Sequence, residues 1–369
     1  MIKIGLITGD LKQNKSGIGT YVFQLIEDLK KNTDLTLIKH PFGDDVLGCS
    51  SILSSIPRRS FSHILWSQAL SLKKQSLKKL DIIHNPAQYP VSPNIGHNYI
   101  VTIHDLIPIL YPQYVGSIFS IQAKLYYPYM LKRASKIITV SNHTKDDILK
   151  IYKIPDQKIE VIYSGVSNHF NPSSPEEKKR IKQKYNLNHP FILFVGAIEP
   201  KKNIELLIKA YYICQKSNPY FDLVIAGKKA WKFETVFKLI ESLNLSKKIH
   251  ILNFVPYEDL PALYSSAEVF VFPSRYEGFG LPPLEAMKCG TPVITSNVSS
   301  LPEIMGKEGL MINPNDYEQL SELILKLLSD PEFHHQYSLY SLDRAKKFSW
   351  KKTASKTLEV YNSVIEYGK

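Results

Sequence analysis

The stretch FILFVGAIEPKKNIELLIKAYYICQK, residues 191–216, decides the fold. It opens on FILFVG, a continuous apolar run typical of a parallel strand whose two faces are both covered. From Asn203 onward the apolar residues recur at helical spacing, which predicts an amphipathic helix with Asn203 as its N-cap. The polar loop between the two carries Lys201 and Lys202. The stretch therefore predicts one βα unit of an α/β fold, with cations at the end of its strand.

The same alternation of apolar runs and helical segments recurs along the chain. In the first half, KIGLIT and YIVTIH read as strands, and HTKDDILKIY reads as a helix with Ser141 as its N-cap. Residues 171–190 are polar, charged and proline-bearing, which predicts a linker running into a surface helix. After that linker the alternation starts again. The chain has 369 residues, so we expect two doubly wound, Rossmann-like domains, at 1–170 and 171–350.

The charge of the chain is basic and unevenly distributed. The formal net charge is +12, and residues 1–170 hold 20 Lys and Arg against 12 Asp and Glu. Such an excess fits an anionic substrate, an anionic membrane surface, nucleic acid, or merely a solvated lysine-rich surface. No RNP, helix-turn-helix or zinc-finger pattern occurs, so a nucleic-acid partner is not expected.

The cysteines and the apolar runs indicate the cellular compartment in which the protein is expected to work. The three cysteines follow no C-x-x-C spacing, so we expect reduced thiols and a cytoplasmic protein. The amino terminus, MIKIGLITGD, reads as a strand rather than a signal peptide. The apolar runs are far shorter than the ~20 residues that cross a bilayer.

Polar groups follow the predicted strands at the places where an open parallel sheet binds its ligands. Such sheets bind ligands beyond the carboxyl ends of their strands. KIGLIT leads to a glycine-bearing loop, and other strands lead to histidine, lysine or arginine; the residues concerned are Ser16, Gly17, Gly19, His84, His104, Asp105, Lys201, Lys202, Lys228, Lys229 and Arg275. The sequence therefore predicts a polar, cationic site at these strand ends.

The stretch SRYEGFGLPPLEAMKCG, residues 274–290, carries two glutamates and two closely spaced glycines. Its two prolines fit the first turn of a helix, which places Glu285 near that turn and beside free backbone N–H groups. A carboxylate accepts hydrogen bonds from the two hydroxyls of a sugar or ribose diol. Glycine lets the main chain approach a phosphate closely. The stretch fits a nucleotide sugar, and the alternative is a loop whose glutamate complements the helix dipole.

No metal or other cofactor is expected at this site. The sequence has no D-x-D motif and no histidine spacing typical of metal ligands. A diphosphate leaving group would then be stabilised by lysines and helix N-termini, and the sequence supplies both.

Taken together, these stretches resemble a known family. The E-x7-E motif from Glu277 to Glu285, with GAIEPKKNIELLIKAY, AGKKAW, SGIGTY, VTIHDLIPILYP and ITVSNHTKDDI, resembles the retaining glycosyltransferases of family 4. The resemblance runs from residue 1 to about residue 365. It implies the GT-B architecture, two Rossmann-like domains facing across a cleft, with a last helix at about 351–369 crossing back to the first domain. It also implies transfer of a sugar from a nucleotide donor to an acceptor hydroxyl with retention of configuration.

The resemblance assigns residues to the donor diphosphate. Gly17 matches the glycine whose backbone contacts the diphosphate. Lys202 matches the lysine that neutralises the diphosphate, and Lys201 matches the basic residue next to that lysine. The loop whose main-chain N–H groups contact sugar and phosphate matches Phe279, Gly280 and Leu281.

The resemblance also assigns residues to the sugar and the ribose. His104 matches the histidine beside the donor sugar, Glu277 the glutamate near the sugar hydroxyls, and Glu285 the glutamate that binds the ribose. His104, Glu277 and Lys202 are the expected catalytic residues. Two positions depart from the family pattern: lysine at 201 replaces a common arginine, and Ser16 precedes Gly17 where a second glycine is usual. A lysine is a point charge without arginine's bidentate fork, so phosphate geometry is expected to be looser.

Within the family, IHDLIPILYP and AGKKAW are most similar to GDP-mannose-dependent mannosyltransferases of surface-polysaccharide assembly. This implies hexosyl transfer to a glycan or lipid-linked acceptor, with peripheral contact at the anionic inner face of the plasma membrane. The alternatives are a UDP-sugar donor with glucosyl, N-acetylglucosaminyl or galactosyl transfer, and a sugar-nucleotide epimerase of the same fold.

Overall fold

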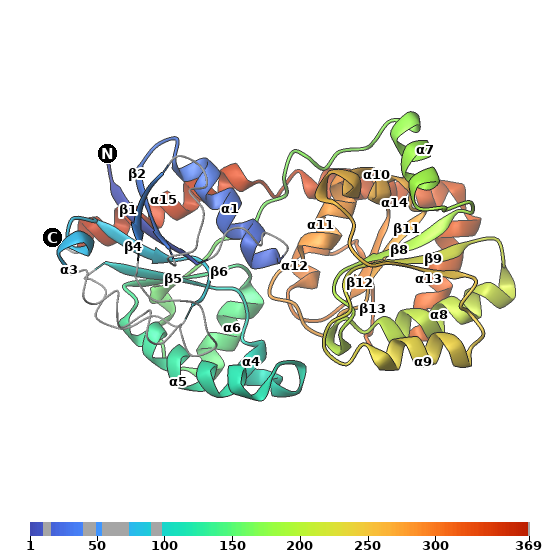
Figure 1. Cartoon of the computed structure of the whole chain (residues 1–369), viewed down its shortest axis with the longest axis horizontal. Helices are drawn as coiled ribbons and strands as arrows, with labels where there is room; N and C mark the ends of the chain where they lie inside the picture. The colour runs from blue at the N-terminus through green and yellow to red at the C-terminus, as the bar shows by residue number, and fades with distance from the viewer. Residues whose placement is uncertain (10–15, 40–48, 54–73, 90–97, 368–369) are drawn as a thin grey trace. The chain divides into compact units, whose positions relative to one another are not determined.

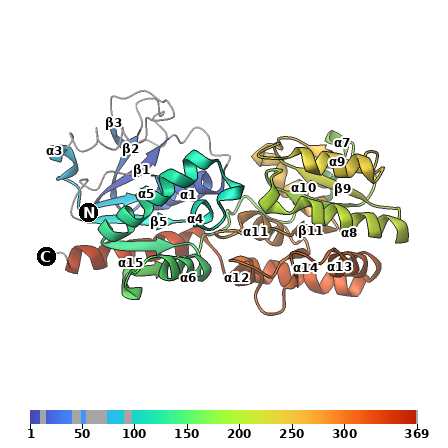
Figure 2. The ribbon, with the colours of Figure 1, turned by 90° about the horizontal axis from the view of Figure 1, so that it is seen from below.

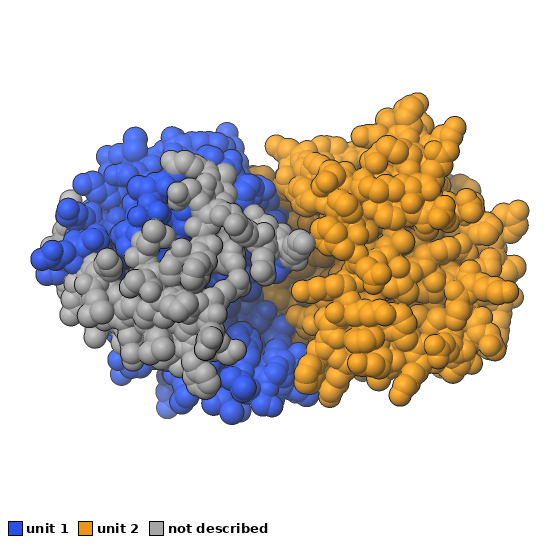
Figure 3. Space-filling view, in the orientation of Figure 1, with its two compact units in different colours: residues 1–165, 350–369 blue, residues 166–349 orange. Residues whose placement is uncertain are grey.

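The structure, a computed structural model, describes residues 1–9, 16–39, 49–53, 74–89 and 98–367. The chain divides into two compact units, which Figure 3 colours separately. Unit 1 is Met1–Gly165 with Trp350–Lys369, and unit 2 is Val166–Ser349. All nine predicted site residues lie in described parts of the chain.

Unit 1 contains a seven-stranded sheet in the order β3-β2-β1-β4-β5-β6-β7, with every neighbouring pair parallel. Because β1 lies between β2 and β4, the direction of winding reverses at β1, as in a doubly wound fold. The strands are β1 (Lys3–Gly9), β2 (Asp34–Lys39), β3 (Ser50–Leu53), β4 (Ile82–Asn85), β5 (Tyr99–Ile103), β6 (Lys136–Thr139) and β7 (Ile159–Val161).

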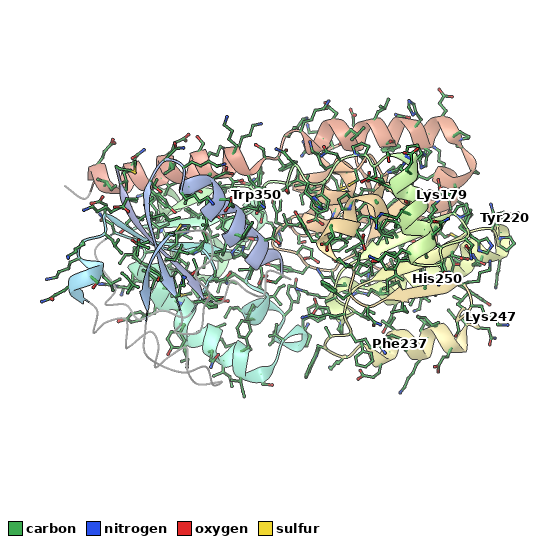
Figure 4. All side chains as sticks on the ribbon, turned by 45° about the horizontal axis from the view of Figure 1, so that its top comes forward. Lys179, Tyr220, Phe237, Lys247, His250 and Trp350 are labelled. Atoms are coloured by element: carbon green, nitrogen blue, oxygen red, sulfur yellow. The ribbon has the colours of Figure 1, made fainter. Side chains whose placement is uncertain are left out.

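Helices cover both faces of this sheet, with α1 and α15 on one side and α5 and α6 on the other (Figure 1). Figure 4 labels Trp350, where α15 begins, and the ring of Trp350 meets that of Tyr21 edge-on at 5.8 Å. Ser141 caps α6, as predicted, because its side chain accepts the Thr144 N–H. The helices are α1 (Gly17–Leu29), α3 (Lys74–Leu77), α4 (Ile107–Leu110), α5 (Ser117–Arg133), α6 (Asn142–Ile151) and α15 (Trp350–Tyr367), with 3-10 turns η2 (Pro112–Tyr114) and η3 (Asp156–Lys158).

Unit 2 contains a six-stranded parallel sheet in the order β10-β9-β8-β11-β12-β13. Its winding reverses between β8 and β11, so the loops that follow these two strands lie side by side. The strands are β8 (Phe191–Val195), β9 (Asp222–Ala226), β10 (Ile249–Leu252), β11 (Val269–Phe272), β12 (Val293–Ser296) and β13 (Leu310–Ile312).

The helices of unit 2 also form two layers. Helix α13 packs against α8 on one face of the sheet, and α14 packs against α11 on the other (Figures 1 and 2). No helix in the described part of the chain is long and apolar enough to cross a membrane. The helices are α7 (Pro175–Lys184), α8 (Ile204–Ser217), α9 (Glu234–Ser242), α10 (Leu260–Ser266), α11 (Leu281–Lys288), α12 (Leu301–Met305), α13 (Tyr317–Ser329) and α14 (Pro331–Ala345), with η4 (Pro200–Lys202) and η5 (Tyr257–Asp259).

The predicted fold class, two Rossmann-like parallel-sheet domains, is confirmed. The structure divides the chain after Gly165, earlier than the predicted 170. The reason is local, because Val166 forms a β-bridge to Ser349 and the buried ring of Phe170 packs on Tyr264 of unit 2. Sequence patterns did not single out β2, β3, β7 or β13, which are short or carry polar residues within the strand.

Candidate active site

An ion pair between Lys202 and Glu277 lies at the strand ends of unit 2. Lys202 belongs to η4, shortly after β8, and Glu277 follows β11, so adjacent strands bring the two together. Lys202 Nζ lies 2.6 Å from Glu277 Oε1, and the side chains are only 12% and 11% exposed. The ammonium group also lies 4.8 Å from the centre of the Phe272 ring. The pair is thus held in a largely desolvated place beside an aromatic face.

The carboxyl group of Glu277 is held in its ionised form. Burial acts to raise its pKa, but the nearby charges of Lys202 and Lys201 and the hydrogen bond from Lys202 outweigh burial and lower the pKa below its ordinary value. Lys201 also lies 3.5 Å from Glu199 Oε1. The strand ends of unit 2 therefore carry two cations, each paired with a carboxylate.

The loop after Glu277 is anchored by two serines that follow β12. Ser299 Oγ accepts the Glu277 N–H at 3.0 Å. Ser300 Oγ lies 2.9 Å from the Glu277 carbonyl oxygen and 2.7 Å from that of Phe279. In a trans peptide the N–H points opposite to the C=O, so the N–H groups of Gly278 and Gly280 point away from Ser300. These two N–H groups are candidate donors to a phosphate.

Gly280 begins α11 in a conformation that other residues rarely adopt. Its φ is 117°, and a Cβ there would lie 2.9 Å from Leu301 Cδ2 and 3.0 Å from Ile304 Cδ1. Pro282 and Pro283 occupy the first turn of α11, as predicted. Because proline has no N–H, however, this helix end has fewer donors for an anion than an ordinary helix end.

Glu285 does not join the pair of Lys202 and Glu277. It lies just after the first turn of α11, near that turn as predicted, and its Oε2 accepts a hydrogen bond from the Tyr264 hydroxyl at 2.9 Å. Burial raises the pKa of Glu285 to about 7, although the bond from Tyr264 acts to lower it. The two glutamates of the motif therefore sit in opposite electrostatic environments.

Asn203 is at the predicted N-cap position, but its side chain has other partners than the helix. It occupies the N-cap position of α8, but with φ 57° and without a side-chain bond to the helix. Its side-chain amide instead donates to the carbonyl oxygens of Pro273, at 3.1 Å, and Pro314, at 2.8 Å. Asn203 thus ties the loop that carries Lys202 to the loop that carries Glu277.

In unit 1, His104 follows β5 and is buried and hydrogen-bonded. Its Nε2 lies 2.7 Å from the carbonyl oxygen of Pro86, so Nε2 carries a proton and Nδ1 is the acceptor nitrogen. The His104 backbone N–H donates to Gln88, and the ring packs edge-on against Tyr21 at 4.9 Å. Burial lowers the pKa of His104 to about 4, although the bond to Pro86 acts to raise it, so the imidazole is neutral near pH 7.

Gly17 begins α1, the helix that carries Tyr21 against His104. Ser16 is the N-cap of α1, and its Oγ accepts the Gly19 N–H at 3.1 Å. The serine that departs from the family pattern therefore organises the exposed first turn of α1. The Gly19 N–H is thus already bonded, and the N–H groups of Gly17 and Ile18 are the ones that an α-helix leaves without an intrahelical partner at an anion-favouring end.

Sequence reasoning missed several residues that shape these loops, notably Ser299, Ser300, Gln88 and Tyr21. Ser299 and Ser300 come shortly after the apolar strand β12, so their position beyond a strand end is the signal that could identify them. Tyr21 ends the stretch SGIGTY but was assigned no role, and Gln88 carries no comparable signal in the sequence. Within the described residues, no group of three or more His, Cys, Asp or Glu side chains is arranged to hold a metal ion.

Two solved structures share this fold. Sucrose-phosphate synthase from Thermosynechococcus elongatus has a TM-score of 0.79 at 22% identity and covers the whole of both chains. Anabaena HepE, solved with UDP and glucose, has a TM-score of 0.80 at 16% identity, covering 98% of this chain and 100% of that one. The two units therefore have the GT-B fold.

Sequence comparison gives the family. The model for glycosyl transferases group 1 matches residues 175–344, and the model for glycosyltransferase family 4 matches residues 15–169. The O-antigen chain mannosyltransferase B of Escherichia coli is 31% identical over 382 residues, which covers 98% of this chain and 99% of that protein. The chain belongs to glycosyltransferase family 4 and is a glycosyltransferase.

Proposed function

We propose that this glycosyltransferase transfers mannose from GDP-mannose, with retention, to a hydroxyl of a growing surface glycan or its lipid-linked precursor. The observation that carries the proposal is the Lys202–Glu277 pair, 2.6 Å apart beside the Gly278–Gly280 loop. The choice of mannose is supported by the Escherichia coli relative, which is named an O-antigen chain mannosyltransferase. The choice of GDP follows from the resemblance to GDP-mannose-dependent enzymes.

The diphosphate is the first group that the site has to hold. Lys202 and Lys201 supply positive charge, and the N–H groups of Gly278 and Gly280 supply directed donors. Charge grows on the leaving diphosphate in the transition state, so fixed cations lower the barrier. We expect these groups to do what a metal ion does in other transferases, and we expect turnover to need no added metal.

The sugar and the ribose are the other groups that need partners. Ionised Glu277 accepts hydrogen bonds from hydroxyls of the donor sugar, and Glu285 accepts from the ribose diol. Neutral His104 offers its acceptor nitrogen Nδ1 to another sugar hydroxyl, since Nε2–H is already bound to Pro86. In a front-side mechanism the leaving phosphate helps to take the acceptor proton, so none of these side chains has to act as a nucleophile.

The acceptor side belongs to unit 1, which carries the larger share of the positive charge. Residues 1–170 hold 20 Lys and Arg against 12 Asp and Glu. A lipid-diphosphate-linked glycan at the inner face of the plasma membrane is anionic and fits this charge. We propose a cytoplasmic enzyme that contacts that membrane peripherally and does not bind nucleic acid.

A thermal-shift screen tests the donor. The chain is heated with GDP, UDP, ADP and their common sugar conjugates, with and without EDTA. Stabilisation by GDP and GDP-mannose alone, unchanged by EDTA, is the expected result. A thermal shift selective for UDP-sugars is consistent with the same enzyme class but contradicts mannose as the transferred sugar. A shift that EDTA abolishes contradicts metal independence, and product analysis without acceptor separates transfer from epimerisation or hydrolysis.

A further inference from the structure

Helix α5 of unit 1 is apolar on two opposite faces. One face packs into the core of unit 1 through residues that include Ala123, Tyr127, Met130 and Leu131. The opposite face carries Ile118, Ile121, Leu125 and Tyr129, spaced by three or four residues so that they line one side of the helix. These four side chains, here called the α5 stripe, are exposed by 71%, 59%, 70% and 52%.

The α5 stripe is unusual for a surface helix. Such helices normally turn polar residues to solvent, and an aligned set of large exposed apolar side chains marks a surface that meets another molecule. At 1.5 Å per residue the stripe runs about 16 Å along α5. Phe119, which is 53% exposed, adds a further apolar side chain beside it.

The charge around the stripe identifies its partner. Residues 106–145 contain five Lys and Arg and no Asp or Glu. Three of these cations, Lys124, Lys132 and Arg133, are exposed residues of α5 itself. By helical geometry, Lys124 and Arg133 flank the stripe on its two sides and Lys132 continues it at the C-terminal end. An apolar line bordered by cations matches a bilayer surface, whose acyl region lies beneath anionic headgroups.

We propose that α5 is the membrane-docking element of this enzyme, lying in the plane of an anionic bilayer with the α5 stripe at the boundary of headgroups and acyl chains. This rests on the proposed function, since a lipid-linked acceptor requires the enzyme to work at a membrane. Tyr129 has an apolar ring and a polar hydroxyl, which suits that boundary. The cations add long-range attraction that salt weakens.

Vesicle flotation of the full chain tests the proposal. Vesicles of phosphatidylcholine with phosphatidylglycerol are compared with vesicles of phosphatidylcholine alone, at low and at high salt. We expect binding to the anionic vesicles that high salt reduces. Ile121→Ser/Leu125→Ser is expected to weaken this binding by at least about tenfold. Lys124→Glu/Lys132→Glu is expected to weaken vesicle binding by at least about 25-fold, because each lost cation weakens binding by about fivefold or more.

Matched variants keep the test specific. Leu339 and Tyr220 are exposed apolar residues of unit 2, at 53% and 73%, so Leu339→Ser/Tyr220→Ser controls for the loss of apolar surface. Lys346→Glu/Lys347→Glu controls for net charge with two exposed lysines of unit 2. The assignment of the membrane contact to α5 is overturned by either of two results. In one, the control variants lose as much vesicle binding as the α5 variants; in the other, the α5 variants bind vesicles as well as the wild-type chain does.

Two further readouts separate the remaining outcomes. Leu125→Trp is expected to show a blue-shifted emission on anionic vesicles that brominated lipids quench, and Leu339→Trp is not. Analytical ultracentrifugation without lipid tests for a dimer. If the wild-type chain is a dimer, and Ile121→Ser/Leu125→Ser makes it a monomer that still binds vesicles, the α5 stripe is a contact with a second copy and the proposal is overturned. Nucleotide-dependent thermal shifts retained in a protein that fails to float refute the docking and leave the proposed function standing.

Discussion

Lys202 Nζ lies 2.6 Å from Glu277 Oε1, although 75 positions separate the two residues in the chain. Their contact joins the loop after β8 to the loop after β11, and the two charges lie in a largely desolvated place. The lysine that is expected to meet the diphosphate is therefore already oriented by the carboxylate that is expected to meet the sugar. Preorganised charge of this kind costs no rearrangement at the moment of reaction.

Lys202→Ala is expected to lower kcat by about 100-fold or more, because charge on the diphosphate grows in the transition state. Glu285→Ala is expected to raise KM by removing a ribose acceptor, with a smaller effect on kcat. Steady-state kinetics with the donor varied distinguishes the two. Lys346→Ala, at a side chain 71% exposed, is the control for losing one cation. Equal effects of Lys202→Ala and Glu285→Ala on KM alone, with kcat unchanged, contradict this division of roles.

The same ion pair makes a prediction about stability. Removing Lys202 leaves the Glu277 carboxylate buried without its partner, which costs about 3–5 kcal/mol where a buried pair is broken. Lys202→Ala/Glu277→Ala removes both charges and is expected to unfold at a higher denaturant concentration than Lys202→Ala alone. Denaturant unfolding of the three proteins measures the coupling. A double variant that loses the sum of both single effects contradicts it.

Glu285 predicts a pH dependence of donor binding. Its pKa in the ligand-free protein is raised by burial to about 7. Ribose hydroxyls that donate to the carboxylate favour the ionised form, so bound nucleotide lowers this pKa. Binding then releases protons, and nucleotide affinity rises from about pH 6 to about pH 8. Calorimetry in two buffers of different ionisation enthalpy measures the proton release.

Two variants check that Glu285 is the titrating group. Glu285→Gln is expected to flatten the pH dependence. Tyr264→Phe removes a hydrogen bond that lowers the pKa of Glu285, so the midpoint is expected to move to higher pH. Because the folded pKa is raised, Glu285 stabilises unit 2 at low pH, and that contribution is lost as pH rises from about 4.5 towards about 7. A pH dependence that survives Glu285→Gln contradicts the assignment.

The sequence predicted the strands and the loops that carry chemistry better than it predicted individual side-chain partners. Apolar runs such as FILFVG arise because both faces of a parallel sheet are buried, and every sequence that folds into such a sheet needs apolar residues on both faces. The bond from Asn203 to Pro273 and Pro314, by contrast, depends on the register of β8 and β11 in space. Local helix-capping rules predicted the N-cap position of Asn203 correctly, but its side chain bonds to these two carbonyl groups instead of to the helix. The position of Glu285 near the first turn of α11 was predicted from the two prolines, but its hydrogen bond from Tyr264 was not, because Tyr264 lies on another helix.

Gly280→Ala is expected to weaken donor binding and to lower the stability of unit 2. A side chain at φ 117° is strained by about 1–3 kcal/mol, and the added Cβ would press on Leu301 and Ile304. Relief of that strain would turn the Gly280 N–H away from its present direction. Gly116→Ala is the matched control, because Gly116 has a negative φ and nothing lies within 4 Å of a Cβ built there. Nucleotide thermal shifts and denaturant unfolding report the two effects, and wild-type behaviour of Gly280→Ala would show that the loop does not need glycine.

Tyr361 and His84 predict how α15 is held to unit 1. The Tyr361 hydroxyl lies 2.6 Å from His84 Nδ1, and His84 Nε2 lies 2.8 Å from Thr102 Oγ1. Both His84 and Tyr361 are fully buried. Burial, with a smaller contribution from His104, lowers the pKa of His84 to about 3, so the ring is neutral and needs one donor and one acceptor partner. The C-terminal helix is therefore fixed to β4 by a buried polar contact rather than by apolar packing alone.

Tyr361→Phe leaves His84 Nδ1 buried without this partner and is expected to cost about 1–3 kcal/mol of stability in unit 1. Limited proteolysis is expected to cleave α15 sooner, since the helix loses its polar anchor. His84→Leu/Tyr361→Phe removes both polar groups and is expected to recover part of the loss, because an unmade buried hydrogen bond costs more than an apolar pair. Tyr317→Phe, at a ring 36% exposed in unit 2, controls for the loss of one hydroxyl. If the double variant is less stable than Tyr361→Phe alone, packing of the His84 ring, and not its hydrogen bond to Tyr361, holds α15 in place.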